Sequence, residues 1–411
     1  MTRLPRLLSP SAAWAVLALG LALPAAAAPS NYKYRPGLTG RAAVLLIHGL
    51  ASSSRHFTDP GSAWSIKDGH FDHRSSVDSS TGTSEHLKAG LDSVGLSPVD
   101  QNADAAHSFA SKLNAFGFGV ATWDQVPCMD DGSFPTDACL DGDTFDAAWP
   151  STLAAFDQLA ADTAQQKLPL ALIGHSRGGR LARKLLKVVV ATKRPGWDRV
   201  RWLITLHTPH HGSSMATQGA EFQKALGSPG KALDLDIVPK VVRDDVSKAV
   251  SSVTGGLNGS INALVKIAGL RGARELAQGG AIYKDIEKDE VKVPKVQVLT
   301  FGGDSPRIAY GYAYVYTAES AEPHKVWKKM GAIKRPGTEY HWESKPHRIL
   351  DFPAGLGSSF PELKPGGDLL VTDSSSHFGF EDQHVTESYN HAEVLWASDV
   401  QATIVTHLLL P

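Results

Sequence analysis

The sequence predicts an α/β fold with a mostly parallel central sheet, because apolar runs typical of buried strands alternate with helical patterns. The first run, RAAVLLIH at 41–48, is continuously apolar, as in a strand that is covered on both faces. A chain of 411 residues with 42% apolar residues can fill a large core, which excludes a disordered or fibrous protein. Its net charge of −1 excludes a protein built to coat nucleic acid or anionic membrane, since both need a basic excess.

The predicted elements alternate along the chain in the order that a parallel sheet requires. The predicted strands are 41–48, 117–126, 168–175, 199–208 and 293–303, and the predicted helices are 105–116, 145–165, 178–192 and 392–410. Residues 52–104 form a long polar connection, which is either a functional loop or an insertion. Residues 215–290 have helical spacing and are expected to form a cap over the sheet edge, whereas 305–366 are aromatic, proline-rich and expected to be irregular.

Residues 1–28 are predicted to be a signal peptide, so the folded domain is expected over 29–411. Arg3 and Arg6 precede an apolar run from 12 to 23, and small residues at 24–28 supply a cleavage site. The alternative is a membrane anchor, but an anchor needs about 20 apolar residues and this run is shorter. We therefore expect an exported protein, either secreted or periplasmic.

Export changes the interpretation of the two cysteines. Cys128 and Cys139 lie in one short polar loop, and in an oxidising compartment they are expected to form a disulfide that closes this loop. The alternative is a weak calcium site formed by the neighbouring aspartates, which are Asp130, Asp131 and Asp137. We assign the cysteines a structural role and no part in the chemistry.

The segment Gly-His-Ser-Arg-Gly at 174–178 fits the pattern G-x-S-x-G. It follows a predicted buried strand directly and precedes a predicted helix, which is the context in which a serine is held on a tight strand–turn–helix elbow. The N-terminus of that helix directs free N–H groups at charge that develops beside the serine. Ser176 is therefore the candidate nucleophile.

Acyl transfer also needs two N–H donors for the oxyanion. We assign these to the backbone of Arg177, which follows the nucleophile, and of Leu50, which follows the first strand. His48 is expected to shape that loop and is kept as an alternative catalytic base. His48, His175 and His207 are expected to line the substrate site, and the turn at 207–212 ends the next strand at the same sheet edge.

These motifs together resemble a known family. HGL at 48–50, GHSRGG at 174–179 and TPHHGS at 208–213 look like the α/β-hydrolase fold, specifically the secreted bacterial lipases and their esterase relatives. The resemblance covers most of 41–225 and returns near 280–304 and 366–411. It is weak over 52–104 and 305–365.

In this fold the chain order of the triad is serine, acid, histidine. The base is expected in the loop before the last helix, where His391 stands, with His377 and His384 as alternatives. The acid is assigned to Asp368, because the segment GGDLLVTD resembles the lipase pattern D-G-x-V, although Leu369 stands where the family usually has glycine.

The acid has two alternatives, Asp304 directly after the fifth predicted strand and Asp373 further along the loop. Glu393 occupies a position where lipases of this type often carry a calcium-binding aspartate. No cofactor is expected, and no metal ligand is assigned, but calcium binding stays open.

The sequence thus predicts an exported serine hydrolase that cleaves carboxylic esters, with a preference for lipophilic acyl chains. The partner is expected to be a small ester or lipid, with transient contact to a lipid interface through the helical cap and no contact with nucleic acid. The alternatives are cleavage of an amide, thioester or polyester by the same triad, and a non-catalytic binding protein of the same fold. The oligomeric state does not follow from the sequence.

Overall fold

The computed structural model describes most of the expected domain. The described residues are 31–50, 52–58, 79–84, 87–96, 108–125, 144–218, 221, 243–244, 247–248, 270–280, 284, 292–307, 309–318, 324–330, 333–339, 342–352, 360–377 and 379–410. The predicted signal peptide, both cysteines and most of the predicted cap at 215–290 lie outside these residues. None of the helices in the described part is long and apolar enough to cross a bilayer.

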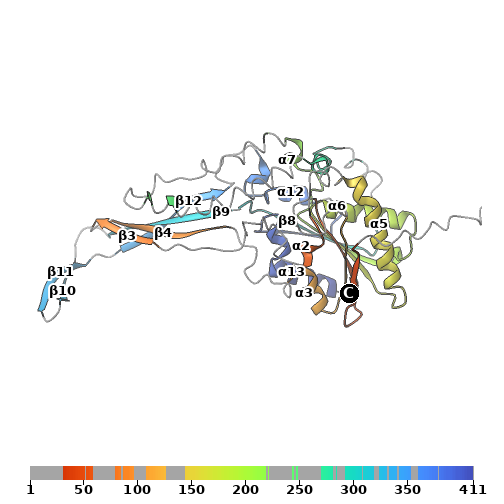
Figure 1. Ribbon diagram of the computed structural model, residues 1–411, viewed down its shortest axis with the longest axis horizontal. Helices are drawn as coiled ribbons and strands as arrows, with labels where there is room; N and C mark the ends of the chain where they lie inside the picture. The colour runs from red at the N-terminus through yellow and green to blue at the C-terminus, as the bar shows by residue number, and fades with distance from the viewer. Residues whose placement is uncertain are drawn as a thin grey trace, which may run out of the picture.

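A seven-stranded sheet forms the centre of the molecule (Figure 1). Its strands, in spatial order, are β1 (Lys33–Arg35), β5 (Gly119–Thr122), β2 (Ala43–Ile47), β6 (Leu170–His175), β7 (Val200–Leu206), β8 (Gln297–Gly303) and β13 (Gln383–Glu387). The strand β1 pairs antiparallel with β5, and every other pair in this sheet is parallel. The predicted mostly parallel α/β sheet is confirmed.

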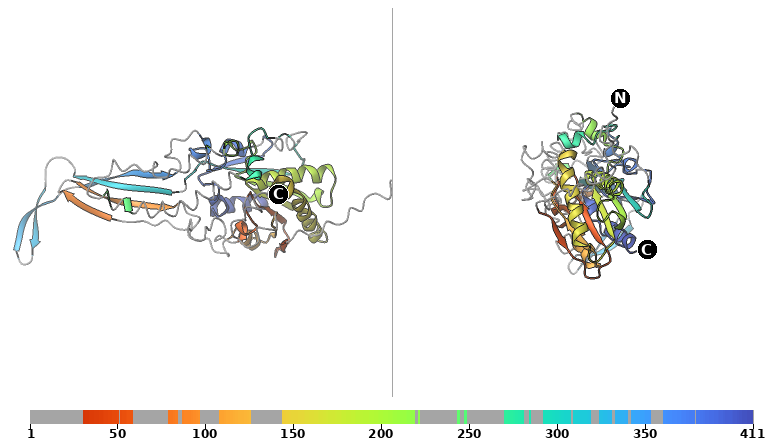
Figure 2. Two further views of the ribbon diagram at one scale, coloured as in Figure 1. Left: turned by 45° about the horizontal axis from the view of Figure 1, so that its top comes forward. Right: turned by 90° about the vertical axis from the view of Figure 1, so that its right-hand side faces the viewer.

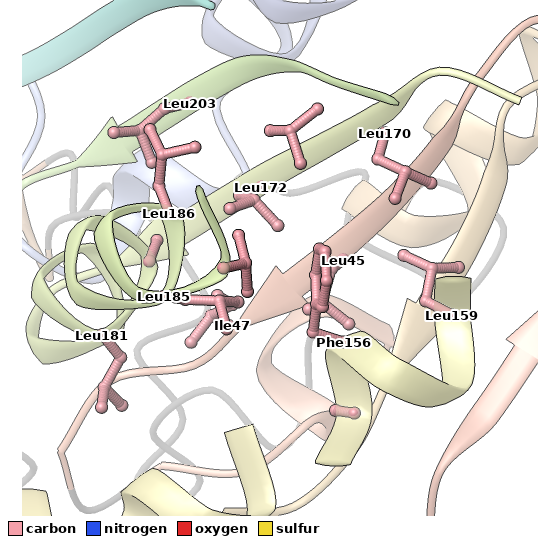
Figure 3. Packing of buried hydrophobic residues seen from close by; sticks show 14 of the residues in the cluster. Leu45, Ile47, Phe156, Leu159, Leu170, Leu172, Leu181, Leu185, Leu186 and Leu203 are labelled. Atoms are coloured by element: carbon pink, nitrogen blue, oxygen red, sulfur yellow. The ribbon is translucent and has the colours of Figure 1, made fainter. Parts of the chain in front are cut away.

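Helices cover both faces of this sheet, and the side chains of each strand alternate between two cores. From β2, Leu45 and Ile47 join the core under α5 (Phe145–Asp162) and α6 (Arg177–Ala191), which Figure 3 shows from close by. Val44 and Leu46 join the opposite core, beneath α3 (Phe109–Ala115) and α13 (Ser398–Leu409). Burial on both faces explains why the predicted strand is continuously apolar.

The helices α5 and α3 begin where the sequence supplies capping side chains. The Thr144 hydroxyl accepts the backbone N–H of Ala147 at 3.2 Å, and the Ser108 hydroxyl accepts that of Ser111 at 3.2 Å. The short helical elements are α2 (Arg55–Thr58), η3 (Trp197–Arg199), α7 (Ser214–Thr217), α10 (Arg271–Arg274), η6 (Pro361–Leu363), α12 (Asp373–Ser376) and η7 (Glu393–Leu395).

A second sheet extends away from the central sheet as a long arm (Figures 1 and 2). It is antiparallel, and its order is β12 (Trp342–Phe352), β9 (Ala309–Ala318), β4 (Leu87–Leu96) and β3 (Ser79–Ser84). A separate hairpin of β10 (His324–Met330) and β11 (Ile333–Glu339) lies at the end of the arm. The arm is therefore built from the two regions in which the family resemblance is weak.

The prediction that 305–366 is irregular was wrong for these strands. The sequence of β9, AYGYAYVYTA, alternates tyrosine with smaller residues, which is a strand pattern, but its partner β4 is far away in the chain. The strand β13 was also missed, because its sequence QHVTE is polar and suits only the edge of a sheet.

The architecture is that of the α/β-hydrolase fold, as the resemblance implied. Parallel strands flanked by helices lead into a serine on the tight turn between β6 and α6. Because the carboxyl ends of β2, β6, β7 and β8 lie along one edge, the loops that follow these strands come together there.

Candidate active site

Ser176 occupies the single residue between β6 and α6. Its backbone has φ 56° and ψ −130°, a conformation that a non-glycine residue rarely adopts. The Ser176 N–H donates to the carbonyl of Leu206 at 2.9 Å, which ties this turn to the end of β7. The strained turn holds the serine side chain at the edge of the sheet, and this is the geometry of a nucleophile elbow.

His391 lies in the loop between β13 and α13, beside this elbow. The preceding residue of the elbow, His175, has its Nε2 2.8 Å from the carbonyl oxygen of His391, and the two rings are 4.9 Å apart. The Nδ1 of His391 lies 2.9 Å from Oδ2 of Asp368. Its Nε2 is buried and has no hydrogen-bond partner among the described residues. This ring is therefore held at Nδ1 and offers Nε2 for proton transfer.

Asp368 is completely buried and receives polar contacts on both oxygens. Its Oδ1 accepts the backbone N–H groups of Leu370 at 3.0 Å and Val371 at 2.7 Å, while Oδ2 faces the two imidazoles of His391 and His207. Burial alone would raise the pKa of the Asp368 carboxyl. The imidazoles of His391 and His207 outweigh burial and hold this pKa well below its usual range. The carboxylate is thus ionised at neutral pH.

His207 makes a contact that the sequence did not suggest. It directly follows β7, has φ 48°, is fully buried, and places Nδ1 2.8 Å from the same oxygen of Asp368 that His391 contacts. Burial lowers the pKa of His207 although Asp368 acts in the opposite direction, so this imidazole is neutral at neutral pH. One oxygen of the acid therefore faces two imidazoles, those of His391 and His207.

A glycine at the end of β8 makes this convergence sterically feasible. A Cβ on Gly303 would lie 2.5 Å from Cε1 of His207 and 2.8 Å from Cβ of Asp368. Any side chain here would push the two groups apart. The sequence contained a hint of this role in the Gly-Gly pair that closes the predicted strand at 293–303.

The alternative acids and bases have other partners. Asp373 has its Oδ1 3.0 Å from Nε2 of His384, and His377 has its Nδ1 2.8 Å from Oε1 of Glu381. Asp304 connects to the neighbouring segments through its backbone, whose N–H donates to the carbonyl of Glu387 at 3.0 Å. Of the three candidate aspartates, only Asp368 contacts His391 among the described polar contacts.

The two proposed oxyanion donors belong to segments that adjoin Ser176. Arg177 begins α6, where the first N–H groups have no partner inside the helix. The loop that carries Leu50 packs closely against the elbow, because a Cβ on Gly49 would lie 2.8 Å from Cβ of Ser176. Their role as donors stays a prediction.

His48 fixes the shape of this loop. The backbone N–H of Gln125 donates to Nε2 of His48 at 3.0 Å, so the proton lies on Nδ1 and is donated to the carbonyl of Gly49 at 3.0 Å. Gln125 also accepts a hydrogen bond from the buried Arg177 side chain at 2.6 Å, which links the loop to α6. With both nitrogens engaged in this way, His48 has a positioning role rather than that of the base.

Glu393, the residue considered as a calcium ligand, makes local hydrogen bonds. One carboxylate oxygen of Glu393 accepts the backbone N–H of Asn390 at 3.0 Å, and the Asn390 side chain accepts the N–H of Glu393 at 3.1 Å. In the described part of the chain, Glu393 belongs to no group of three metal-type ligands. Calcium binding there stays an open expectation.

The protein is similar to known proteins in structure but not in sequence. No family model matches the chain, and no curated protein matches it. Its structure is similar to lipase BlEst2 of Bacillus licheniformis in mature form, with 12% identity, TM-score 0.44, and 93% of this chain and 99% of that chain covered.

It is also similar to a monoglyceride lipase from Saccharomyces cerevisiae, with 10% identity, TM-score 0.41, and 92% and 89% of the two chains covered. A third similar structure is phospholipase PlaB from Legionella pneumophila, with 11% identity, TM-score 0.39, and 90% and 60% covered. Likeness at this level does not show what this chain does. The activity must therefore be argued from the site itself.

Proposed function

We propose that the protein is a serine hydrolase that cleaves carboxylic esters through an acyl-enzyme, with Ser176 as nucleophile, His391 as base and Asp368 as acid. The observation that carries the proposal is the joint placement of a serine at φ 56° and a histidine held at Nδ1 by a buried carboxylate 2.9 Å away. The Nε2 of His391 is buried and has no hydrogen-bond partner among the described residues, so it is available to take the serine proton. This arrangement supplies the nucleophile, the base and the group that orients the base.

In the proposed reaction, Oγ of Ser176 attacks the ester carbonyl while Nε2 of His391 takes the hydroxyl proton. The backbone N–H groups of Leu50 and Arg177 stabilise the oxyanion of the tetrahedral intermediate. The intermediate collapses and expels the alcohol, which leaves with the proton from His391. Water then attacks the acyl-enzyme with His391 again as base, releasing the carboxylic acid and restoring Ser176. Asp368 stays ionised throughout and keeps the His391 proton on Nδ1.

We also propose that the protein acts after export, on esters with lipophilic acyl chains. Export is supported by the N-terminal sequence pattern, and lipophilic substrates by the helical, apolar spacing of 215–290. The predicted Cys128–Cys139 disulfide belongs to the same proposal. Mass mapping of the exported, non-reduced protein tests export and the disulfide. It should find an N-terminus near residue 28 and the peptides of Cys128 and Cys139 joined.

The test of the proposed chemistry is Ser176→Ala assayed against p-nitrophenyl esters of increasing acyl length, with and without emulsified triglyceride. We expect kcat to fall by about 10⁴ or more while the circular dichroism spectrum is unchanged. Near-normal turnover by this variant would exclude Ser176 as nucleophile. A wild-type protein without turnover on any of these p-nitrophenyl esters or on triglyceride would favour the amide, thioester or polyester alternatives, or a binding protein.

A further inference from the structure

A second aspartate–histidine cluster lies beside the proposed triad and takes no part in its chemistry. Asp373, His377 and His384 each offer a ligand atom, and these atoms all lie within 4.8 Å of one another. Asp373 comes five positions after the acid Asp368, so the segment that carries the acid leads directly into this second cluster.

The three side chains reach this point from two separate elements. Asp373 begins α12 and His377 directly follows it, a separation of four residues that brings both to one side of a single helical turn. His384 comes from the edge strand β13, where it pairs with Thr300 of β8. Its ring is stacked on that of His377 with centroids 3.4 Å apart, and its Nε2 lies 3.0 Å from Oδ1 of Asp373.

The outer nitrogen of each ring has its own partner. Oε1 of Glu381 lies 2.8 Å from Nδ1 of His377, and the Thr300 hydroxyl lies 2.7 Å from Nδ1 of His384. A proton on each Nδ1 would satisfy both contacts and leave a lone pair on each Nε2. In the other tautomer of His384, Nε2–H donates to the Asp373 carboxylate at 3.0 Å and Nδ1 accepts from the Thr300 hydroxyl, so a metal ion would take the place of the Nε2 proton. Carboxylate-oriented imidazoles of this kind are typical of zinc sites.

The backbone under the cluster is also shaped for close approach. A Cβ on Gly302 would lie 2.1 Å from Oδ1 of Asp373, so only glycine lets this carboxylate reach its position over β8. The side chains of Asp373 and His384 are 23% and 10% exposed, and that of His377 is 42% exposed. The cluster is thus sheltered on the sheet side and accessible to an ion from the His377 side.

We propose that Asp373, His377 and His384 bind a divalent transition-metal ion, and specifically zinc. Two imidazole nitrogens and one carboxylate oxygen are the donors that zinc favours, whereas calcium and magnesium favour an all-oxygen set. The bound ion connects the segment that follows Asp368 to the edge strand β13. It therefore stabilises the position of the proposed acid. It does not touch the reacting atoms, and the inference holds whether or not the protein cleaves esters.

The test is zinc binding by the untagged full-length protein after its metal has been removed with a chelator. Titration in competition with a chromophoric chelator should find one zinc per chain, and addition of zinc should raise the melting temperature. Glu381→Gln, which removes an outer partner, should weaken binding by about 10- to 100-fold. Asp373→Asn and His377→Ala, which remove ligands, should weaken it further.

The matched control is His347→Ala, which removes a histidine of β12 in the arm and should bind zinc like the wild type. Cobalt offered in place of zinc provides a readout that does not depend on any variant folding, because the wild type should give a visible spectrum typical of nitrogen and oxygen ligands. Absence of saturable zinc binding by the wild type would overturn the proposal. So would ligand variants that bind as tightly as the wild type, or loss of binding in the control.

Discussion

The two aspartate–histidine clusters of this protein have similar residues and different surroundings. The Asp368 cluster is closed to water, with side-chain exposures of 0% for Asp368 and 3% for His391, whereas in the outer cluster the exposure reaches 42% at His377. The inner carboxylate is fully used by backbone N–H groups and two imidazoles, and it holds one ring toward the serine. The outer carboxylate lies within hydrogen-bond distance of Nε2 of His384, whose proton a metal ion would replace in the proposed site. The two clusters contain the same residue types. They differ in burial and in the partners of the carboxylate, and these two differences underlie the two proposed roles.

The largest expected effect comes from breaking the inner cluster. Asp368→Asn should lower kcat by about 10⁴, since an amide leaves the His391 proton on the wrong nitrogen. The matched control is Asp304→Asn, which should lose far less because Asp304 makes no described contact with His391. Steady-state kinetics and melting temperatures of both variants give the answer. If the Asp304 variant were the inactive one, the acid would belong at the end of β8.

The next effect concerns the second imidazole on the acid. His207→Phe keeps a ring behind Asp368 but removes the nitrogen 2.8 Å from its carboxylate, so it should lower kcat by about 10-fold and the free energy of unfolding by about 1–3 kcal/mol. His207→Gln, which can place an amide N–H near the carboxylate, should recover part of both losses.

A pH readout distinguishes this positioning role from simple packing. The pKa of Asp368 is lowered in the folded protein, so its stabilising contribution is present above the unfolded-state pKa and is lost as pH falls through the folded-state value. His207→Phe reduces that lowering but also removes a buried imidazole whose own pKa is lowered, so the stability deficit of the variant should shrink as pH falls. A stability deficit that does not change with pH, together with normal kcat, would show that His207 only fills space.

Buried neutral histidines set a second pH dependence. Burial lowers the pKa of His175 and His210 well below the usual value, so the folded protein binds fewer protons than the unfolded chain below about pH 6.5. The free energy of unfolding should then decrease as pH falls from 6.5, by up to about 1.4 kcal/mol per pH unit for each histidine. Urea unfolding at several pH values measures this slope. His210→Gln should reduce it, and an equal slope in that variant would contradict the assignment.

The smallest effect tests the strained loop next to the acid. Leu369 has φ 95°, at the position where the resembled lipases usually have glycine, and its side chain is buried. Leu369→Gly and Leu369→Ala both lose the buried side chain, but only alanine keeps the backbone strain. The glycine variant should therefore be more stable than the alanine variant by about 1 kcal/mol, the reverse of the usual order. Equal melting temperatures would mean that the loop is not strained at this residue.

The local parts of the site could be predicted from the sequence, and the long-range parts could not. The elbow at Ser176 is a contiguous motif between two recognisable elements, and His391 and Asp368 follow from chain order and a short resemblance. The contact between His207 and Asp368 joins residues far apart in the chain, and burial hides it from any local pattern. The arm was missed for the same reason, since β4 and β9 each lack a partner until the fold brings them together.

The central claim is that Ser176 is the nucleophile of a working triad, and covalent labelling tests it most directly. A fluorophosphonate should add one group per chain, located by tandem mass spectrometry on Ser176, and the rate of labelling should fall by orders of magnitude in Asp368→Asn but little in Asp304→Asn. Labelling of a different residue, or full ester turnover by a protein that Ser176 labelling has saturated, would contradict the account.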